Sequence, residues 1–434
     1  MRYKSTNKKA PSVTFREAIL NGLAPDGGLY MPSALPRLPS NTLKNLNRLS
    51  FQDIANIIAR CFIGKEMSRR VLRSIIDDTL NFKVPLVRLS EDTFVLELFN
   101  GPTLSFKDFG ARFMARAMSY FVRGDGQELT VLVATSGDTG SAVAHGFLRV
   151  PGIRVVILYP KGRVSPLQEK QLTTMGHNIT AVEIAGTFDD CQRLTKTAFS
   201  DVGLSRTVRL TSANSINIGR LIPQIFYYAW GCAQYPTTGM PLVYSVPSGN
   251  FGNLTAGLIG KHIGLPIAKF IAATNANRVV PEYLEHGRFI PRASKKTISN
   301  AMDVGNPSNF VRMLELYHHS ANRMCRDMYG VSFTDTETRS AMRAVYRKYK
   351  YVLDPHGAIA YLGLERYRRI SKKRFLGIAL ETAHPAKFKN VIEKTLHTKV
   401  ALPHRLAVYA KRKEKVLRCS KDFETFKESL LHIA

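Results

Sequence analysis

From about residue 130 onward, short apolar runs rich in β-branched residues alternate with longer amphipathic stretches, and glycine turns separate the two. This alternation predicts βα units that form open, mostly parallel sheets with helices on both faces, because strands covered on both sides are apolar throughout. The predicted strands are Thr130–Ala134, Arg154–Tyr159, Ile179–Ile184, Leu242–Val246, Lys269–Ala273 and Phe375–Leu380. The predicted helices are Thr139–Leu148, Ser165–Met175, Phe188–Phe199, Asn214–Ala233, Gly252–His262 and Pro385–Leu396.

The first 80 residues follow a different pattern. They begin with turn-rich sequence that includes the run Pro25-Asp26-Gly27-Gly28, and this run is followed by several further prolines. A helical pair is predicted after it, at Phe51–Cys61 and Ser68–Leu80. We therefore expect a separate N-terminal layer.

The composition is that of a globular protein with an unusual charge. The chain has 434 residues, of which 44% are apolar, so disorder of the whole chain is excluded. The longest apolar run, Leu221–Ala233, is interrupted by Pro223 and is shorter than the ~18 residues of a membrane-spanning helix. The 62 Lys and Arg exceed the 33 Asp and Glu by 29, a surplus that leaves nucleic acid, an anionic surface or a small acidic ligand open as partners.

Cysteine usage and the N-terminus indicate a protein of a reducing compartment. The five cysteines form no Cys-x-x-Cys pair, which argues against a zinc module or a disulfide scaffold, and we expect no metal. The opening residues contain no apolar segment of a secretory signal, so a cytoplasmic location is expected. Two basic clusters, at 366–374 and 411–415, are not accompanied by a DNA-docking motif and are interpreted as solvated faces.

Two glycine-rich turns follow predicted strands and precede predicted helices. The first is Thr-Ser-Gly-Asp-Thr-Gly at 135–140 and the second is Ser-Gly-Asn-Phe-Gly-Asn at 248–253. Backbone N–H groups at such a helix N-terminus suit a phosphate or a carboxylate, and glycine allows the ligand to approach closely. Each loop by itself is either an anion cradle or a plain strand-to-helix turn.

Three further positions have side chains suited to anion or amine chemistry. Lys107 lies between two aromatic residues before a predicted helical stretch, and apolar surroundings disfavour its charged form, as a Schiff-base amine requires; a surface lysine is the alternative. Asn214, Asn217 and Arg220 recur at steps of three, which on one helix face would suit an oxyanion or, alternatively, a structural network. Thr382 follows the last predicted strand, at the sheet edge where open α/β folds bind ligands.

Together these segments resemble the threonine synthase family, pyridoxal-phosphate enzymes of the tryptophan-synthase-β fold type. The resemblance rests on Ser-Phe-Lys-Asp around Lys107, both glycine loops, Asn-Ser-Ile-Asn with Arg220, the run Met302–Phe310, and Thr-Ala-His-Pro-Ala-Lys-Phe from Thr382. It extends from residue 3 to about residue 390. It implies an N-terminal domain at 1–80, a large cofactor-binding α/β domain at 81–129 and 211–434, and a smaller α/β domain at 130–210.

The resemblance also implies roles for individual residues. Lys107 would form the Schiff base with pyridoxal phosphate and move protons at Cα and Cβ of the substrate. Thr382 would face the pyridine nitrogen, and Asp138 would lie near the ring oxygen. The cofactor phosphate would be held by Ser248, Gly249, Asn250, Phe251, Gly252 and Asn253. The substrate carboxylate would be held by Thr135, Ser136 and Thr139. The substrate phosphate would be held by Asn214, Asn217 and Arg220.

The implied reaction converts O-phosphohomoserine and water into threonine and phosphate. A phosphate ester carries about −1.5 to −2 charges, whereas a helix N-terminus supplies about +0.5, so at least one cationic side chain is needed and Arg220 is our choice. Two alternatives remain: a phospholyase that stops at 2-oxobutyrate, and a catalytically silent relative that binds polyanions. The protein is expected to be a monomer or homodimer.

Overall fold

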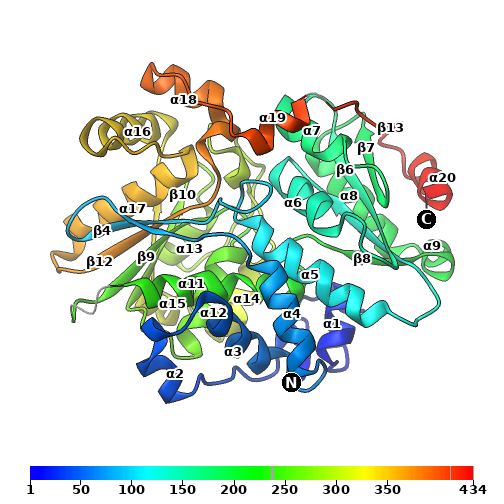
Figure 1. Ribbon diagram of the computed structural model, residues 1–434, viewed down its shortest axis with the longest axis horizontal. Helices are drawn as coiled ribbons and strands as arrows, with labels where there is room; N and C mark the ends of the chain where they lie inside the picture. Colours follow the sequence, from blue (N-terminus) through cyan, green and yellow to red (C-terminus); the bar gives the residue numbers. More distant parts are fainter. Residues whose placement is uncertain (236–238, 411, 434) are drawn as a thin grey trace.

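Two β-sheets form the centre of the molecule in the computed structural model, which describes residues 1–235, 239–410 and 412–433 (Figure 1). The six-stranded sheet has the order β11 (Met328–Ser332), β10 (Lys269–Thr274), β9 (Leu242–Pro247), β12 (Leu376–Glu381), β4 (Thr93–Glu97) and β3 (Leu86–Arg88). The five-stranded sheet has the order β13 (Val416–Cys419), β7 (Ile179–Ile184), β6 (Ile153–Pro160), β5 (Leu129–Ala134) and β8 (Arg209–Ser212). All neighbouring strands are parallel except β3 and β4.

The N-terminal layer consists of a small antiparallel pair and helices that cover the lower side of the molecule in Figure 1. Its elements are β1 (Tyr3–Ser5), β2 (Tyr30–Pro32), α1 (Phe15–Asn21), α2 (Ser40–Lys44), the 3₁₀ turn η1 (Leu46–Arg48), α3 (Phe51–Ile63) and α4 (Arg69–Thr79). Thr14 begins α1 as a capping box with Glu17, since each side chain accepts a hydrogen bond from the other residue's backbone N–H. The layer shares one hydrophobic core with both sheets, so it is an integral part of the fold.

Helices cover both faces of both sheets, as the continuous apolar strands require. The helices near the five-stranded sheet are α5 (Lys107–Val122), α6 (Asp138–Phe147), α7 (Pro166–Thr173), α8 (Phe188–Ser200), α9 (Val202–Thr207) and α20 (Phe423–Ile433). The other elements are α10 (Ile218–Leu221), α11 (Gln224–Gln234), α12 (Gly252–His262), α13 (Val279–His286), η2 (Asn300–Met302), α14 (Phe310–Leu316), α15 (Ala321–Asp327), α16 (Asp335–Tyr349), α17 (Pro355–Ser371), η3 (Pro385–Phe388), α18 (Lys389–Leu396) and α19 (His404–Ala410).

All six predicted strands are present, with ends that differ by at most a residue, but one predicted helix is wrong. Residues 214–217 do not belong to a helix: Asn217 caps the short helix α10, and α11 begins only after Pro223. Proline lacks the N–H that a continuous helix would need at this point. The predicted helix at 385–396 is divided into η3 and α18.

The C-terminal segment returns to the five-stranded sheet. β13 pairs with β7, and α20 packs against α8. The family resemblance implies instead that all of 211–434 belongs to the large cofactor-binding domain. Strand membership therefore places residues 416–433 with the segment around 130–210. The division of the chain into three domains stays a prediction.

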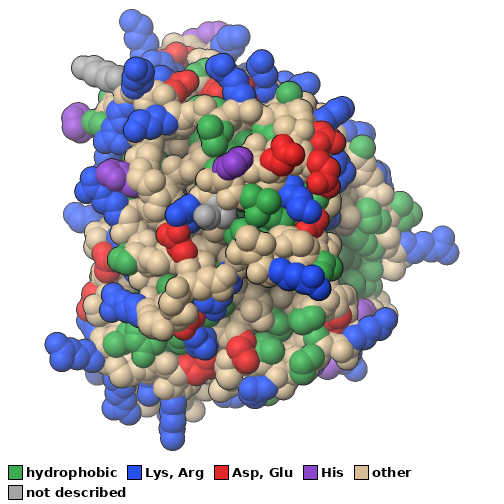
Figure 2. All heavy atoms as spheres, turned by 90° about the vertical axis from the view of Figure 1, so that its right-hand side faces the viewer, with side chains coloured by type: hydrophobic (Ala, Val, Ile, Leu, Met, Phe, Trp, Pro, Cys, Tyr) green, Lys and Arg blue, Asp and Glu red, His purple; other side chains and the backbone are tan. Residues whose placement is uncertain are grey.

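Basic side chains are not gathered in one patch on the face that carries α20. On this face, Figure 2 shows Lys and Arg interspersed with Asp, Glu and hydrophobic side chains. In the cluster at 366–374, Arg368 is used structurally, because it donates to Thr93 and to the backbone of Asp92. Lys411, in the second cluster, lies outside the described residues. No helix in the described parts of the chain is long and apolar enough to cross a membrane.

Candidate active site

Lys107 is held at the carboxyl edge of the six-stranded sheet by the loop that precedes it. The N–H of Phe106 donates to the carbonyl of Thr382 at 2.9 Å, and the N–H of His384 donates to the carbonyl of Leu104 at 3.0 Å. Ser105 and Ala383 form an antiparallel bridge between these bonds. Lys107 begins α5, so its position depends on a loop fastened to the end of β12.

The surroundings of Lys107 favour a neutral amine. Burial lowers the pKa of Lys107 to about 8, and the positive charges of Lys387 and Arg220 act in the same direction, whereas Asp138 opposes them. A neutral amine is the form that attacks an aldehyde or accepts a proton. Burial of Lys107 therefore gives the lowered pKa that a Schiff-base amine requires.

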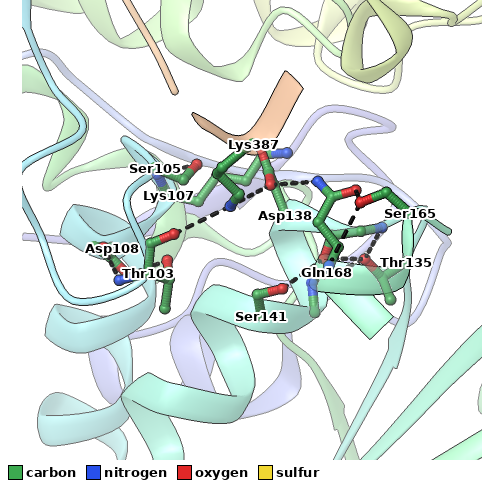
Figure 3. Close-up of polar contacts among 12 residues, drawn as sticks. Thr103, Ser105, Lys107, Asp108, Thr135, Asp138, Ser141, Ser165, Gln168 and Lys387 are labelled. Carbon is green, nitrogen blue, oxygen red and sulfur yellow. Dashed lines mark hydrogen bonds and ion pairs between the residues drawn. The ribbon is translucent and has the colours of Figure 1, made fainter. Parts of the chain in front are cut away.

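Asp138 lies at the N-terminus of α6 and forms an ion pair with Lys387 of η3, the turn that follows β12 (Figure 3). Lys387 Nζ lies 2.5 Å from Asp138 Oδ1 and also donates to the carbonyl of Thr103 at 3.1 Å. Gln168 Nε2 donates to the same Asp138 oxygen at 2.6 Å. Burial alone would raise the pKa of Asp138, but Lys387, Lys107 and Gln168 hold it well below its usual range.

Lys387 is the residue of this site to which sequence reasoning assigned no role. It lies within the motif that begins at Thr382, and its side chain is completely buried in η3. A lysine two residues after a proline, beyond the last predicted strand, carries no local sign of burial. A buried cation requires a partner, and here that partner comes from the distant loop at 135–140.

The loop after β9 presents a row of free backbone donors. Among the described residues, the N–H groups of Gly249, Asn250, Phe251 and Gly252 donate to no acceptor. These groups lie at the N-terminus of α12, where the helix dipole favours an anion. A Cβ at Gly249 would lie 2.6 Å from the carbonyl oxygen of Ala301, so only glycine fits there.

Side chains around this loop hold its shape. Asn250 Oδ1 accepts from the N–H and the hydroxyl of Ser308, and Asn253 Nδ2 donates to the carbonyl of Pro247 at 2.8 Å. The Ser248 hydroxyl and N–H already donate to backbone carbonyls. Ser248 and Asn253 thus order the cradle with their side chains, and the free N–H groups lie between them.

The loop after β5 forms a second cradle. Thr135 Oγ1 accepts from the N–H groups of Gly137 and Gly140 at 3.0 Å and 2.8 Å, which closes the turn. Gly137 has a φ of 144°, which a residue with a side chain rarely adopts. In this part of the described chain the N–H groups of Ser136 and Thr139 donate to no acceptor. The Thr135 side chain therefore shapes the loop, while Ser136 and Thr139 offer donors.

The expected common helix face of Asn214, Asn217 and Arg220 is wrong, because Asn217 precedes α10 rather than lying in it. Asn217 is fully buried, and its amide donates to the carbonyls of Ile19 and Ser212 at 2.9 Å each. No N–H of its side chain remains for an anion. Asn214 donates to the carbonyl of Ala134, which connects it to the second cradle.

Arg220 is buried against α5, since a Cβ at Gly110 would lie 2.8 Å from its Nε, and its charge lowers the pKa of Lys107 at the start of that helix. Its Nη1 donates to the carbonyl of Ala213 at 2.6 Å, and its buried Nε has no partner among the described residues. Burial lowers the pKa of Arg220 to about 10, so the side chain remains a cation at neutral pH. The assignment of Arg220 to a substrate phosphate stays a prediction, and its unpartnered Nε is compatible with it.

A second buried arginine, which sequence reasoning did not identify, connects three parts of the chain. Arg312 donates to the carbonyls of Tyr30 in the N-terminal layer and of Ser215 and Ile216 before α10. It also donates to Asn309, whose N–H donates to the carbonyl of Asn250 in the first cradle. Arg312 thus supports the cradle from behind.

The donor set fits pyridoxal phosphate. The cradle at 249–252 suits its phosphate, the Lys107 amine suits its aldehyde, and the Thr382 hydroxyl makes no hydrogen bond within the described chain and suits its ring nitrogen. β9 and β12, which are directly followed by Ser248 and Thr382, are adjacent. The three groups therefore meet at one edge of one sheet.

Comparisons with known proteins agree with this assignment. Residues 80–377 match the family model described as pyridoxal-phosphate dependent enzyme, 2–80 match threonine synthase N terminus, and 357–429 match threonine synthase, C-terminal. A threonine synthase of Haemophilus influenzae is 47% identical over 91% of each chain. The crystal structure of threonine synthase from Escherichia coli has a TM-score of 0.93 at 41% identity and covers 100% of both chains.

A structure with bound cofactor is also similar. The pyridoxal-phosphate-bound threonine synthase from Brucella melitensis has a TM-score of 0.92 at 33% identity, over 100% of this chain and 99% of that one. Cofactor, fold and motifs thus point to the same family. The chain belongs to the threonine synthase family of pyridoxal-phosphate-dependent lyases.

Proposed function

We propose that this protein converts O-phospho-L-homoserine and water into L-threonine and phosphate. One observation carries the proposal: two anion cradles and the buried guanidinium of Arg220 lie at one site with Lys107, an amine whose pKa is lowered by burial. The two cradles match a cofactor phosphate and a substrate carboxylate, and Arg220 matches a second phosphate.

The cofactor is held by residues of both the first cradle and β12. Gly249, Asn250, Phe251 and Gly252 would donate their N–H groups to its phosphate, while Thr382 would present a hydroxyl to its ring nitrogen. Pyridoxal phosphate, when bound, supplies an electron sink for charge that develops at the substrate's Cα and Cβ. A hydroxyl partner does not require the ring nitrogen to be cationic.

Lys107 is the acid and base of the reaction. Its pKa of about 8 lies close to neutral pH, where a group both accepts and returns protons efficiently. In this role it removes protons at Cα and Cβ of the substrate. One proton is returned to Cγ after phosphate has left and one to Cα after the hydroxyl of water has added at Cβ, while the other proton of that water leaves with the phosphate. Asp138, kept ionised by Lys387, stabilises positive charge next to Lys107.

The substrate is oriented by the second cradle and by Arg220. The N–H groups of Ser136 and Thr139 bind its α-carboxylate at the N-terminus of α6. Arg220 and Asn214 bind its phosphate and stabilise the negative charge of the leaving group. Asn217 acts on this pair only through the backbone it holds, at Ser212 and Gly219.

We also infer a cytoplasmic monomer or homodimer that functions without nucleic acid. The dispersed basic side chains on the face in Figure 2 support the absence of a nucleic-acid partner there, since recognition of a polyanion favours a continuous basic face. Retention of a DNA duplex at physiological salt, with affinity falling steeply as salt rises, would contradict it.

Product identity tests the proposed reaction. The purified protein, loaded with pyridoxal phosphate, is incubated with O-phosphohomoserine, and products are separated by chromatography. Threonine and phosphate in equal amounts are expected, with no product from Lys107→Ala. Formation of 2-oxobutyrate and phosphate without threonine identifies a phospholyase and rejects the proposal; no turnover of the loaded protein rejects both.

A further inference from the structure

A cavity of about 440 Å³ lies outside the site described above, behind the loop that carries Lys107. Its wall includes Arg112 of α5, His145 of α6, Arg405 and Tyr409 of α19, Arg412 just beyond α19, and Phe82 after α4. The volume is in the range of pockets that hold small molecules. Within the described residues no Asp or Glu lines it, so three guanidiniums face one space without an acidic partner in its wall.

Each of the three guanidiniums retains N–H groups that donate to nothing in the described chain. Arg112 is 5% exposed and uses its Nε and Nη2 on Thr79, Asp78 and Asn81, which leaves Nη1. Arg405 uses only Nη1, on the carbonyls of Asn100 and Gly101. The Arg412 guanidinium lies over the Tyr409 ring, 5.0 Å from its centroid, and donates to no acceptor.

The local field is positive, as a neighbouring histidine shows. Burial lowers the pKa of His145 to about 4, and Arg112, Arg116 and Arg412 add to this shift by disfavouring a further positive charge. A bound anion would relieve that repulsion. Phe82 and Tyr409 give the same cavity an aromatic part, which suits an organic ligand rather than water alone.

We propose that this cavity is a second ligand site, which binds a small organic molecule bearing phosphate groups. Phosphate matches the donors because guanidinium groups bind its oxygens in pairs, and two or three of them can engage one polyvalent anion. The site is separate from the predicted substrate positions, since none of its lining residues belongs to either cradle. It does not depend on the reaction proposed above.

The cavity is connected to Lys107 through Arg405. The carbonyls that Arg405 holds, at Asn100 and Gly101, begin the loop that ends at Lys107. Gly101 packs directly on Asp108, whose carboxylate accepts from the N–H and the hydroxyl of Thr103. An anion that recruits Arg405 therefore acts on the same loop that positions the amine.

Calorimetric titration of the cofactor-loaded protein with inorganic pyrophosphate tests the site. Wild type is expected to bind in the millimolar range or tighter, and Arg412→Gln to bind about tenfold more weakly through loss of a charged donor. Val408→Trp, on the α19 face that lines the cavity, fills the space without changing charge and is expected to abolish binding. Arg369→Gln removes an exposed arginine on α17 and is the matched control.

The outcomes separate the proposal from its alternatives. Equal affinity of wild type, Arg412→Gln and Val408→Trp, or no binding by wild type, overturns it, as does an equal loss in Arg369→Gln. Citrate is titrated in parallel, and binding of citrate as tightly as pyrophosphate overturns the assignment to phosphate. Circular dichroism of each variant confirms that it is folded, so that a loss of binding is not a loss of structure.

Discussion

Lys387 and Asp138 form a buried ion pair, 2.5 Å between Nζ and Oδ1. It joins η3, which follows β12 of the six-stranded sheet, to the start of α6, which follows β5 of the five-stranded sheet. The two charges of the pair shift the pKa of Lys107 in opposite directions, since Lys387 lowers it and Asp138 raises it. The pKa of the Lys107 amine and the contact between η3 and α6 therefore depend on the same two charges.

Removal of Lys387 is expected to be costly for both stability and chemistry. Lys387→Met leaves the buried Asp138 without its ion-pair partner, and breaking a buried pair from one side costs about 3–5 kcal/mol. The free energy of unfolding in urea is the measurement. Lys387→Met combined with Asp138→Asn removes both charges and is expected to recover part of the loss.

Lys389→Met is the control for that experiment. Lys389 lies two residues further on, at the start of α18, and its side chain is exposed and 3.8 Å from Glu393. Its replacement is expected to change the free energy of unfolding by no more than about 0.5 kcal/mol. If the double variant is as unstable as Lys387→Met, the cost does not come from an unpaired Asp138.

The pKa of Lys107 predicts how cofactor loading depends on pH. The neutral amine is the reactive form, so the rate at which cofactor-free protein takes up pyridoxal phosphate is expected to rise with pH around a midpoint near 8. Lys387→Met removes a charge that lowers this pKa, and its midpoint is expected to move upward. Stopped-flow absorbance measures both profiles, and a midpoint near 10.5 in wild type would contradict the assigned environment.

Gly249 is expected to tolerate no side chain. In Gly249→Ala the new Cβ would lie 2.6 Å from the Ala301 carbonyl oxygen and 2.9 Å from Met302 Cα, both backbone atoms, so the cradle must move. Pyridoxal phosphate is expected to bind at least about tenfold more weakly, since a hydrogen bond to a charged group contributes roughly 1.5–3 kcal/mol. Fluorescence titration measures it. Gly203→Ala, in α9, is the control and is expected to bind the cofactor as wild type does.

The strands were predictable because their signal is local. Leu129–Ala134 and Leu242–Pro247 are buried along their whole length, and burial on both faces produces a mostly apolar run that the sequence displays. The break in the helix expected at 214–233 could not be predicted, because the apolar periodicity of the sequence continues through Asn217 and Pro223. In the structure, the Asn217 cap and the missing N–H of Pro223 divide the segment. The return of β13 to β7 joins residues more than 230 positions apart and has no local signal.

The site divides in the same way. Lys107, Thr382 and the two glycine loops could be proposed as site residues from the sequence because each lies just after a strand or at the start of a helix, where chemistry and local pattern coincide. Lys387 and Arg312 were not, since their burial depends on partners from distant segments, Asp138 and the carbonyl of Tyr30. Spacing alone also suggested a ligand role for Asn217, whose donors are in fact used inside the fold.

Glu381, which precedes Thr382, is expected to be protonated in the folded protein. Burial, together with the charges of Asp354 and Glu97, raises its pKa well above the usual value, while the unfolded chain loses that proton near pH 4.3. Wild type therefore loses stability relative to Glu381→Gln as pH rises above that value. Urea unfolding at pH 4.5 and pH 7 is expected to show a difference that favours Glu381→Gln and grows with pH. Glu424→Gln, which removes an exposed carboxyl in the same way, serves as the matched control.

Arg220 is expected to act on the substrate rather than on the cofactor. Arg220→Met removes the buried guanidinium, and kcat/KM for O-phosphohomoserine is expected to fall about 10- to 100-fold, the loss of one or two charge-assisted hydrogen bonds. Arg220→Lys keeps the charge without the planar fork, so it should recover only part of the activity. Pyridoxal phosphate affinity, measured by fluorescence titration, is expected to stay within about twofold of wild type in both variants. A selective loss of cofactor affinity with kcat/KM unchanged at saturating cofactor would instead place Arg220 at the cofactor and leave the substrate phosphate to another side chain.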